Sequence, residues 1–285
     1  MGQEGRALAL QDGGLFVINI LSLGAGVQST TMALMAAHGE ITPMPDYAIF
    51  ADTGAEPWHV YDQLDFLEEV LPFPVLRVME HDGLHKNIFS ALKDGKDSKG
   101  RYASAPFFTE SKTGRGMLRR QCTSEFKIKP IERKVRQLLG LKKGQRAPKE
   151  IAVSMWVGIS ADEAQRMKPN QKHYIQNRWP LIEKEMYRWG CLQWMEKHGY
   201  ELPKKSACYF CPYHDDKTWL DIKQNDPDAW DDAVKMDEMI RGGVHKTKQK
   251  LFRHSSLTPL ADVDLDPDRD QVDMFGNECE GMCGV

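Results

Sequence analysis

The sequence contains no apolar run long enough to cross a membrane as a helix, which takes about 20 consecutive apolar residues. Its 285 residues are 41% hydrophobic and 28% charged, which is typical of a globular protein that folds in water. Residues 1–14 lack the apolar segment of a signal peptide, and position 6 is not the Ser or Thr that myristoylation of Gly2 requires. We therefore expect a cytoplasmic protein in which residues 1–14 form a flexible leader.

The sequence also lacks internal repeats, low-complexity tracts and a large excess of charge of either sign, since the net charge is −3. The charge is nevertheless unevenly distributed. Residues 112–149 contain 13 Lys and Arg against two Glu, and residues 260–285 contain eight Asp and Glu against one Arg. The basic segment suits the phosphates of ATP or of a nucleic acid, and the alternative is a helix face exposed to solvent. The length favours one large domain and a smaller one.

A glycine-containing loop between an expected strand and an expected helix is the strongest local pattern. Residues 16–37 read FVINILSLGAGVQSTTMALMAA, with a β-branched apolar run first and a helix-forming run last. Backbone N–H groups and the helix dipole favour an anion at such a junction. The expected phosphate-binding residues are Ser22, Gly24, Ala25, Gly26, Gln28, Ser29 and Thr30.

The loop lacks the Gly-Lys-Ser/Thr of a Walker A motif and the third glycine of a dinucleotide fingerprint. A plain tight turn is the alternative interpretation. The pattern Gly24-Ala25-Gly26-Val27-Gln28-Ser29 resembles the Ser-Gly-Gly-x-Asp-Ser loop of the ATP pyrophosphatase (PP-loop) superfamily. Gln28 stands where that motif has Asp. This variant resembles the branch that contains the phosphoadenylylsulfate (PAPS) reductases.

A second strand is expected over residues 45–51, and it is followed by Asp52 and Thr53. Ligands of open α/β sheets bind at the carboxyl ends of the strands, so both residues are candidates for nucleotide binding. The stretch FADTGAEPWHVYDQLDFLEE, residues 50–69, also resembles the PAPS reductase branch. The alternative for Asp52 is a turn or helix-capping residue.

The basic segment contains the patterns Arg-x-Cys-Thr at residues 120–123 and Lys-Ile-x-Pro-Ile at residues 127–131, and both resemble the same branch. Arg119, Arg120, Lys127 and Lys129 can offset the charge of a triphosphate or of leaving pyrophosphate. Cationic neighbours favour the thiolate form of Cys122. A buried, inert cysteine is the alternative.

A further buried strand is expected over residues 151–157, followed by Gly158 and the cluster Asp162, Glu163 and Arg166. The pattern Gly-Ile-x-x-Asp-Glu-x-x-Arg resembles the segment that closes the nucleotide site in this branch and reaches the second substrate. A helix cap with a local ion pair three residues apart is the alternative.

Six cysteines are present, and the pairs Cys208–Cys211 and Cys279–Cys283 have metal-ligand spacing. Four thiolates suffice for a [4Fe–4S] cluster or for tetrahedral Zn²⁺, with Cys122 as an alternative ligand. The resemblance to a superfamily with iron–sulfur enzymes favours the cluster, whereas structural zinc and free thiols stay open. Cys191, inside an expected helix, is assigned to packing.

The resemblance implies a parallel twisted sheet with helices on both faces, an α/β fold of the adenine nucleotide alpha hydrolase-like type. We expect this PP-loop domain over residues 15–182 and a mainly helical, cysteine-containing region over residues 183–285. The implied reaction is attack of a substrate oxygen on the α-phosphate of ATP with Mg²⁺ present, followed by sulfur transfer from a donor to tRNA or DNA. The catalytic candidates are Ser29, Arg119, Arg120, Cys122 and Lys127.

Two rival functions stay open. A sulfonucleotide reductase would act on PAPS or adenylyl sulfate with thioredoxin and would need no ATP. A nucleotide-binding adaptor with a zinc knuckle would bind ATP without releasing pyrophosphate.

Overall fold

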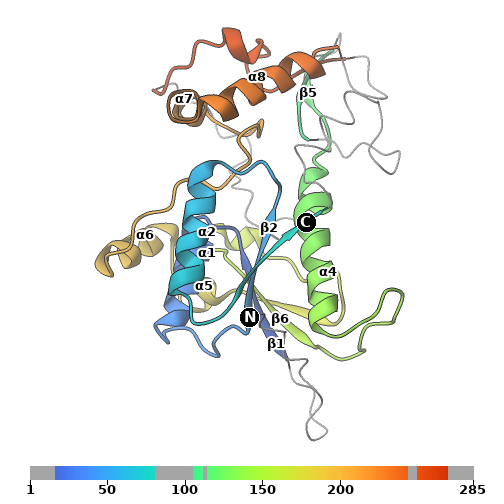
Figure 1. Cartoon of the computed structure of the whole chain (residues 1–285), viewed down its shortest axis with the longest axis vertical. Coiled ribbons are helices and arrows are strands. Elements are labelled where there is room, and N and C mark those ends of the chain that lie inside the picture. The colour runs from blue at the N-terminus through green and yellow to red at the C-terminus, as the bar shows by residue number, and fades with distance from the viewer. Residues whose placement is uncertain (1–16, 81–104, 112–113, 243–248, 269–285) are drawn as a thin grey trace, which may run out of the picture.

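The structure is a computed structural model, and it describes residues 17–80, 105–111, 114–242 and 249–268 (Figure 1). The expected leader, a short helix expected at residues 84–92, and both Cys279 and Cys283 lie outside the described residues. No helix within the described ranges is long and apolar enough to span a membrane.

A five-stranded parallel sheet forms the centre of the larger region, in the order β3-β2-β1-β6-β7. The central strand β1 pairs with β2 on one side and with β6 on the other, and its apolar run is buried on both faces. This topology confirms the predicted α/β class. The strands are β1 (Ile18–Leu23), β2 (Tyr47–Asp52), β3 (Val75–Met79), β6 (Val153–Val157) and β7 (Ile175–Arg178).

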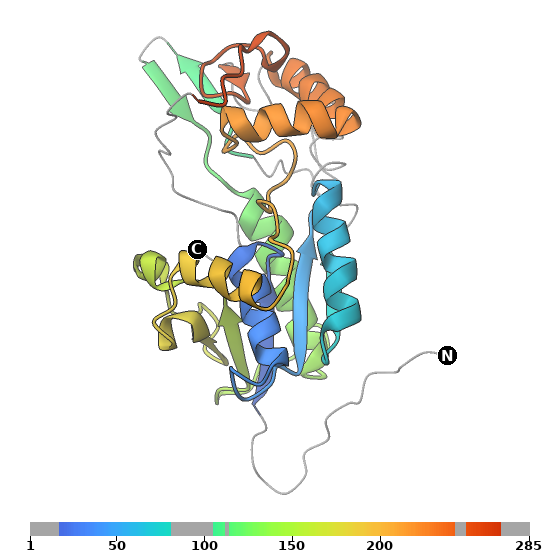
Figure 2. The same ribbon diagram turned by 90° about the vertical axis from the view of Figure 1, so that its left-hand side faces the viewer.

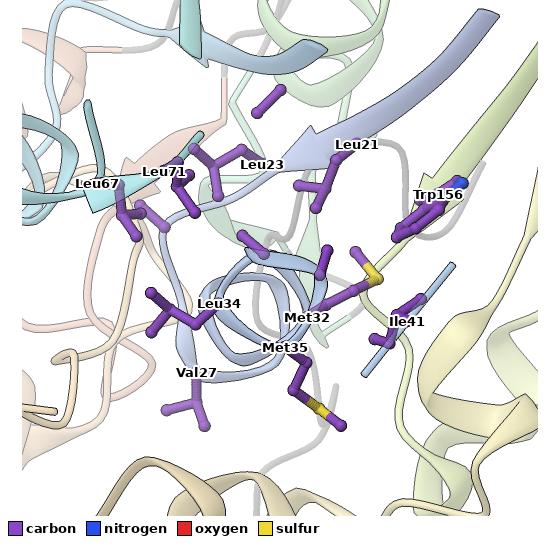
Figure 3. Packing of buried hydrophobic residues seen from close by; sticks show 14 of the residues in the cluster. Leu21, Leu23, Val27, Met32, Leu34, Met35, Ile41, Leu67, Leu71 and Trp156 are labelled. Carbon is purple, nitrogen blue, oxygen red and sulfur yellow. The ribbon is translucent and has the colours of Figure 1, made fainter. Parts of the chain in front are cut away.

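Helices cover both faces of this sheet (Figures 1 and 2). Leu21 and Leu23 of β1 point into a core that includes residues of α1, α2 and α6, as Figure 3 shows around α1. Ile18 and Ile20 point to the opposite face, where α4 packs. This alternation is the period of two that a strand imposes on its side chains. The helices of this region are α1 (Val27–Ala37), α2 (Trp58–Val70), α4 (Lys129–Leu138), α5 (Pro180–Glu183) and α6 (Arg188–Lys197).

The smaller region, at the top of Figure 1, contains two helices and a small antiparallel sheet. It is called the C-terminal region below, although strands β4 and β5 of its sheet come from residues 108–111 and 114–117. Asp215 and Asp226 cap these helices by accepting hydrogen bonds from backbone N–H groups at 2.7 and 3.1 Å. Trp219, Phe107 and Phe210 lie in the core between helices and sheet. The elements are α7 (Asp216–Asn225), α8 (Pro227–Ile240), β4 (Phe108–Ser111), β5 (Gly114–Met117), β8 (Lys250–Phe252) and the 3₁₀ helix η3 (Leu260–Asp262).

The segment that enters the C-terminal region lies against the carboxyl edge of the parallel sheet. Ser206 Oγ donates to the Gly24 carbonyl at 2.5 Å, and Tyr209 N donates to the Ala55 carbonyl at 2.9 Å. The loops after β1 and β2 therefore face this segment, and the predicted nucleotide residues lie where the two regions meet.

Candidate nucleotide and thiol site

The loop between β1 and α1 has a fixed, internally hydrogen-bonded shape. Ser29 Oγ accepts a hydrogen bond from Gly24 N at 3.2 Å and donates one to the Gly26 carbonyl at 3.3 Å. Ala25, which replaces a glycine of the PP-loop motif, has a φ of 57°, in the left-handed region that disfavours a residue with a Cβ. Such backbone conformations concentrate at ligand-binding loops.

Two buried hydroxyl groups beside this loop have no hydrogen-bond partner within the described residues. They are Ser22 Oγ, near the end of β1, and Thr30 Oγ1, in the first turn of α1. The neighbouring Thr31 differs, because its hydroxyl donates to the Val27 carbonyl at 2.8 Å. A buried polar group without a partner costs about 1–3 kcal/mol. Two such groups at one strand–helix junction indicate a polar ligand such as a phosphate.

Gly158, directly after β6, permits the β1–α1 loop to pack closely against the end of β6. A Cβ at this position would lie 3.0 Å from the backbone nitrogen of Ser29. Only glycine therefore fits there without displacing the loop.

Gln28 connects the first turn of α1 to the cluster that follows β6. Its side-chain oxygen accepts from Arg188 Nη1 at 2.8 Å, and its Nε2 donates to Glu163 Oε2 at 3.2 Å. Glu163 also forms an ion pair with Arg166 at 2.6 Å, and Asp162 accepts from Arg188 N at 3.0 Å. The structure thus brings together four predicted residues and adds Arg188, for which no motif gave a signal.

Asp52 closes the turn after β2. Its Oδ1 accepts hydrogen bonds from Gly54 N at 2.7 Å and from the Tyr61 hydroxyl at 3.0 Å. Burial, followed by the nearby Asp52 carboxylate, raises the pKa of Tyr61, which keeps this hydroxyl protonated as a donor. These contacts correspond to the turn-residue alternative for Asp52.

Thr53, directly after β2, joins a buried ionic cluster. Glu56 Oε1 accepts from Thr53 Oγ1 at 2.9 Å and lies 3.5 Å from Lys127 Nζ. The Cys208 thiol donates to the same oxygen at 3.7 Å. The side chains of Glu56 and Lys127 are 0% and 6% exposed, and Glu56 Oε2 has no partner within the described residues.

Three cysteines share one small cavity beside this cluster. Its volume is about 30 Å³, enough for one or two waters and too small for a nucleotide. Burial, followed by the nearby Glu56 carboxylate, raises the pKa of Cys208 well above its ordinary value, so this thiol is protonated. The lining residues that bear on chemistry are Thr53, Arg120, Cys122, Lys127, Cys208 and Cys211.

The Cys208–Cys211 turn is held by a histidine that the sequence analysis did not select. Cys211 N donates to the Cys208 carbonyl at 2.8 Å, and His214 Nε2 donates to the same carbonyl at 2.9 Å. Burial lowers the pKa of His214 to about 3, so the ring is neutral. The signal available in the sequence was the position of His214, three residues after the second cysteine of the pair.

The described residues contain no group of three or more His, Cys, Asp or Glu in an arrangement that could hold a metal ion. Cys122, Cys191, Cys208 and Cys211 form no disulfide, and Cys191 is fully buried in the α1–α6 core. Arg119 is exposed and lines neither the thiol cavity nor the larger cavity described next.

A basic cavity of about 180 Å³ lies at the carboxyl ends of β6 and β7. Lys129, Arg166, Lys168 and Lys172 line it together with a single acidic residue, Glu132. Arg166 belongs both to this cavity and to the Gln28–Glu163 network, so the basic cavity adjoins the start of α1.

Comparison with known proteins gave no matching family model and no matching curated protein. Among solved structures, the chain is similar to a PAPS reductase from Candida auris in complex with phosphate. The identity is 11% and the TM-score 0.40, over 67% of this chain and 75% of that one. A likeness at this level carries no inference about substrate or individual residues, which rest on the motifs and geometry above.

Proposed function

We propose that the chain binds ATP with Mg²⁺ at the β1–α1 loop and adenylylates a substrate with release of pyrophosphate. The observation that carries this proposal is the pair of buried hydroxyls, Ser22 and Thr30, without partners in the described residues at a strand–loop–helix junction. Phosphate oxygens accept strong hydrogen bonds from hydroxyls and from backbone N–H groups, and the helix N-terminus adds a favourable field.

In the proposed reaction a substrate oxygen attacks the α-phosphorus of ATP. A new P–O bond forms, the bond to the β-phosphate oxygen breaks, and pyrophosphate leaves with its electron pair. Mg²⁺, when bound with ATP, would offset the charge of the phosphates. Arg120 adds positive charge to the cavity that Thr53 lines, and Lys127 lines the same cavity while paired with Glu56.

We propose that sulfur then replaces the activated oxygen, with AMP as the leaving group and a nucleic acid, tRNA or DNA, as the acceptor. The thiols of Cys122, Cys208 and Cys211 line one cavity and would receive sulfur from a donor protein. Because this cavity is only about 30 Å³, a [4Fe–4S] cluster or Zn²⁺ would need Cys208 and Cys211 together with further cysteine ligands. Cys279 and Cys283 lie outside the described residues and stay candidate ligands.

The first test is pyrophosphate release from ATP and Mg²⁺ in the presence of tRNA or DNA. We expect release by the wild-type chain and a roughly tenfold slower rate for Ser29→Ala, because the loss of two loop hydrogen bonds of about 1 kcal/mol each loosens the phosphate site. Unchanged turnover in Ser29→Ala would contradict the assigned loop.

The metal proposal has a separate test, which is anaerobic purification followed by an absorption spectrum and metal analysis. We expect iron and the charge-transfer absorption of an iron–sulfur cluster. A colourless protein with stoichiometric zinc would exclude a cluster role.

The second candidate function is a sulfonucleotide reductase, and the observation that favours it is the shared cavity of three thiols. Consumption of PAPS or adenylyl sulfate with reduced thioredoxin, in the absence of ATP, would establish this function and exclude adenylylation.

A further inference from the structure

Tyr187 and Trp189 are the two most exposed large apolar side chains of the described residues, at 59% and 67%. Both lie at the start of α6, one residue on either side of Arg188. Large exposed aromatic side chains next to a binding site mark an interaction surface more often than scattered aliphatic ones do.

Arg188 holds this pair of aromatic residues beside the phosphate loop. Its backbone N–H donates to Asp162 at 3.0 Å, and its guanidinium donates to Gln28 at 2.8 Å. Gln28 is buried in the first turn of α1, so the start of α6 is fixed to the proposed nucleotide site. Both rings are exposed to solvent at the start of α6, the helix that lies in front of the sheet in Figure 2.

The basic cavity adjoins the same network through Arg166, which pairs with Glu163 at 2.6 Å. Lys168 lines this cavity, is exposed, and forms no ion pair within the described residues. The Gln28–Glu163 network thus connects the basic cavity, through Arg166, with the start of α6, through Arg188.

We propose that Tyr187, Trp189 and the basic cavity form a binding surface for unpaired nucleotides of a nucleic acid. The rings stack on bases, and Lys168 contacts the phosphodiester backbone. Bases inside a duplex already stack on each other, so rings that rely on stacking select single-stranded segments, loops or ends. This inference rests on the proposed function, because it specifies the acceptor whose activated group would enter the same site.

The test measures binding of labelled single strands of about 12 nucleotides, within the site sizes of such surfaces, by fluorescence anisotropy. DNA and RNA of one sequence are compared, with a duplex as the third probe. We expect the wild-type chain to prefer a single strand over the duplex. The double substitution Tyr187→Ala and Trp189→Ala should weaken single-strand binding at least about tenfold, since stacking contributes about 1–3 kcal/mol per base.

Three variants serve as controls and as an independent measurement. Trp189→Phe retains a stacking ring and should stay within about threefold of wild type. Val70→Ala removes an exposed apolar side chain at the end of α2 and should leave the affinity for the single strand unchanged. Lys168→Ala should reduce the slope of log affinity against log salt concentration by about one, the value expected for the loss of one phosphate contact.

Binding of ATP, measured by calorimetry on the same samples, separates the two proposals. Single-strand binding that depends on Tyr187 and Trp189 without any ATP uptake would overturn the proposed function and leave the surface standing. No single-strand binding by the wild-type chain, a preference for the duplex, or equal affinity of the double variant would overturn the surface.

Discussion

Two buried aspartates of the C-terminal region and two buried hydroxyls beside the β1–α1 loop differ in how their hydrogen-bonding groups are satisfied. In the C-terminal region Asp237 Oδ1 accepts from Arg253 N at 2.9 Å, and its Oδ2 accepts from Leu260 N at 3.0 Å and from Arg241. In the parallel-sheet region, the hydroxyls of Ser22 and Thr30 are equally buried but lack partners in the described residues.

Asp216 follows the pattern of Asp237. Its Oδ1 accepts from His254 Nε2 at 2.8 Å, and its Oδ2 accepts from Asp266 N at 3.2 Å. These two aspartates tie the segment after β8 to α7 and α8, which is a structural role. The satisfied aspartates stabilise the fold, whereas the two unsatisfied hydroxyls beside the β1–α1 loop are the groups that the proposed phosphate ligand would satisfy.

The largest effect is expected where a satisfied group is removed. Asp237→Ala leaves the partners of a buried carboxylate without an acceptor and should lower the free energy of unfolding by about 3–5 kcal/mol. Urea denaturation measures this change. Asp231→Ala, an exposed change on the same helix, is the matched control and should stay within about 0.5 kcal/mol of wild type. Equal effects of both variants would contradict the structural role of Asp237.

A smaller effect on stability is expected at Gln28, whose side chain both holds neighbouring residues together and lies in the proposed nucleotide-binding loop. Gln28→Met keeps the side-chain size but removes the hydrogen bonds to Arg188 and Glu163, and it should lower stability by about 2 kcal/mol. ATP affinity should fall as well, because the start of α1 loses its connection to α6. Denaturation and calorimetry measure the two changes. A stability equal to wild type would show that the network does not hold the loop.

The smallest effect is expected at His59 of α2, whose Nε2 lies 3.4 Å from the carbonyl oxygen of Lys205, in the segment that leads into the C-terminal region. Burial lowers the pKa of His59, so the folded chain takes up this proton at a lower pH than the unfolded chain, in which a histidine titrates at about 6.5. This contribution to stability is present above that pH and is lost below it. His59→Gln should therefore reduce the slope of stability between about pH 7 and 5, by less than one proton. An unchanged slope would show that His59 does not contribute to the pH dependence of stability.

Much of the fold could be predicted because its signals are local. The apolar runs of β1, β2 and β6 indicate the strands, and the glycine-containing loop after β1 indicates the position of the proposed phosphate site. The contacts that join the regions could not be predicted. Ser206 meets Gly24, and Arg188 meets Gln28, across more than half of the chain, and no spacing rule links such pairs.

Glu56 illustrates a different limit. A glutamate within a turn-rich segment is ordinarily exposed, since carboxylates are rarely buried without a partner. Its burial depends on Lys127 and Cys208, which arrive from two other segments. Conversely, the left-handed conformation falls on Ala25, although Gly24 and Gly26 flank it. Local propensity alone would have chosen a glycine.

The central claim is that ATP binds beside the β1–α1 loop with its phosphates near the Thr30 hydroxyl. The most direct test compares Thr30→Val with Thr31→Val, which remove a hydroxyl at adjacent buried positions of α1. Calorimetry measures ATP affinity, and urea denaturation measures stability. Thr30→Val should weaken ATP binding by about tenfold or more while leaving stability unchanged or higher, because the lost hydroxyl has no partner in the described residues but would donate to a phosphate. Thr31→Val should leave ATP affinity within about twofold. Unchanged ATP affinity in Thr30→Val, or no ATP uptake by the wild-type chain, would contradict the account.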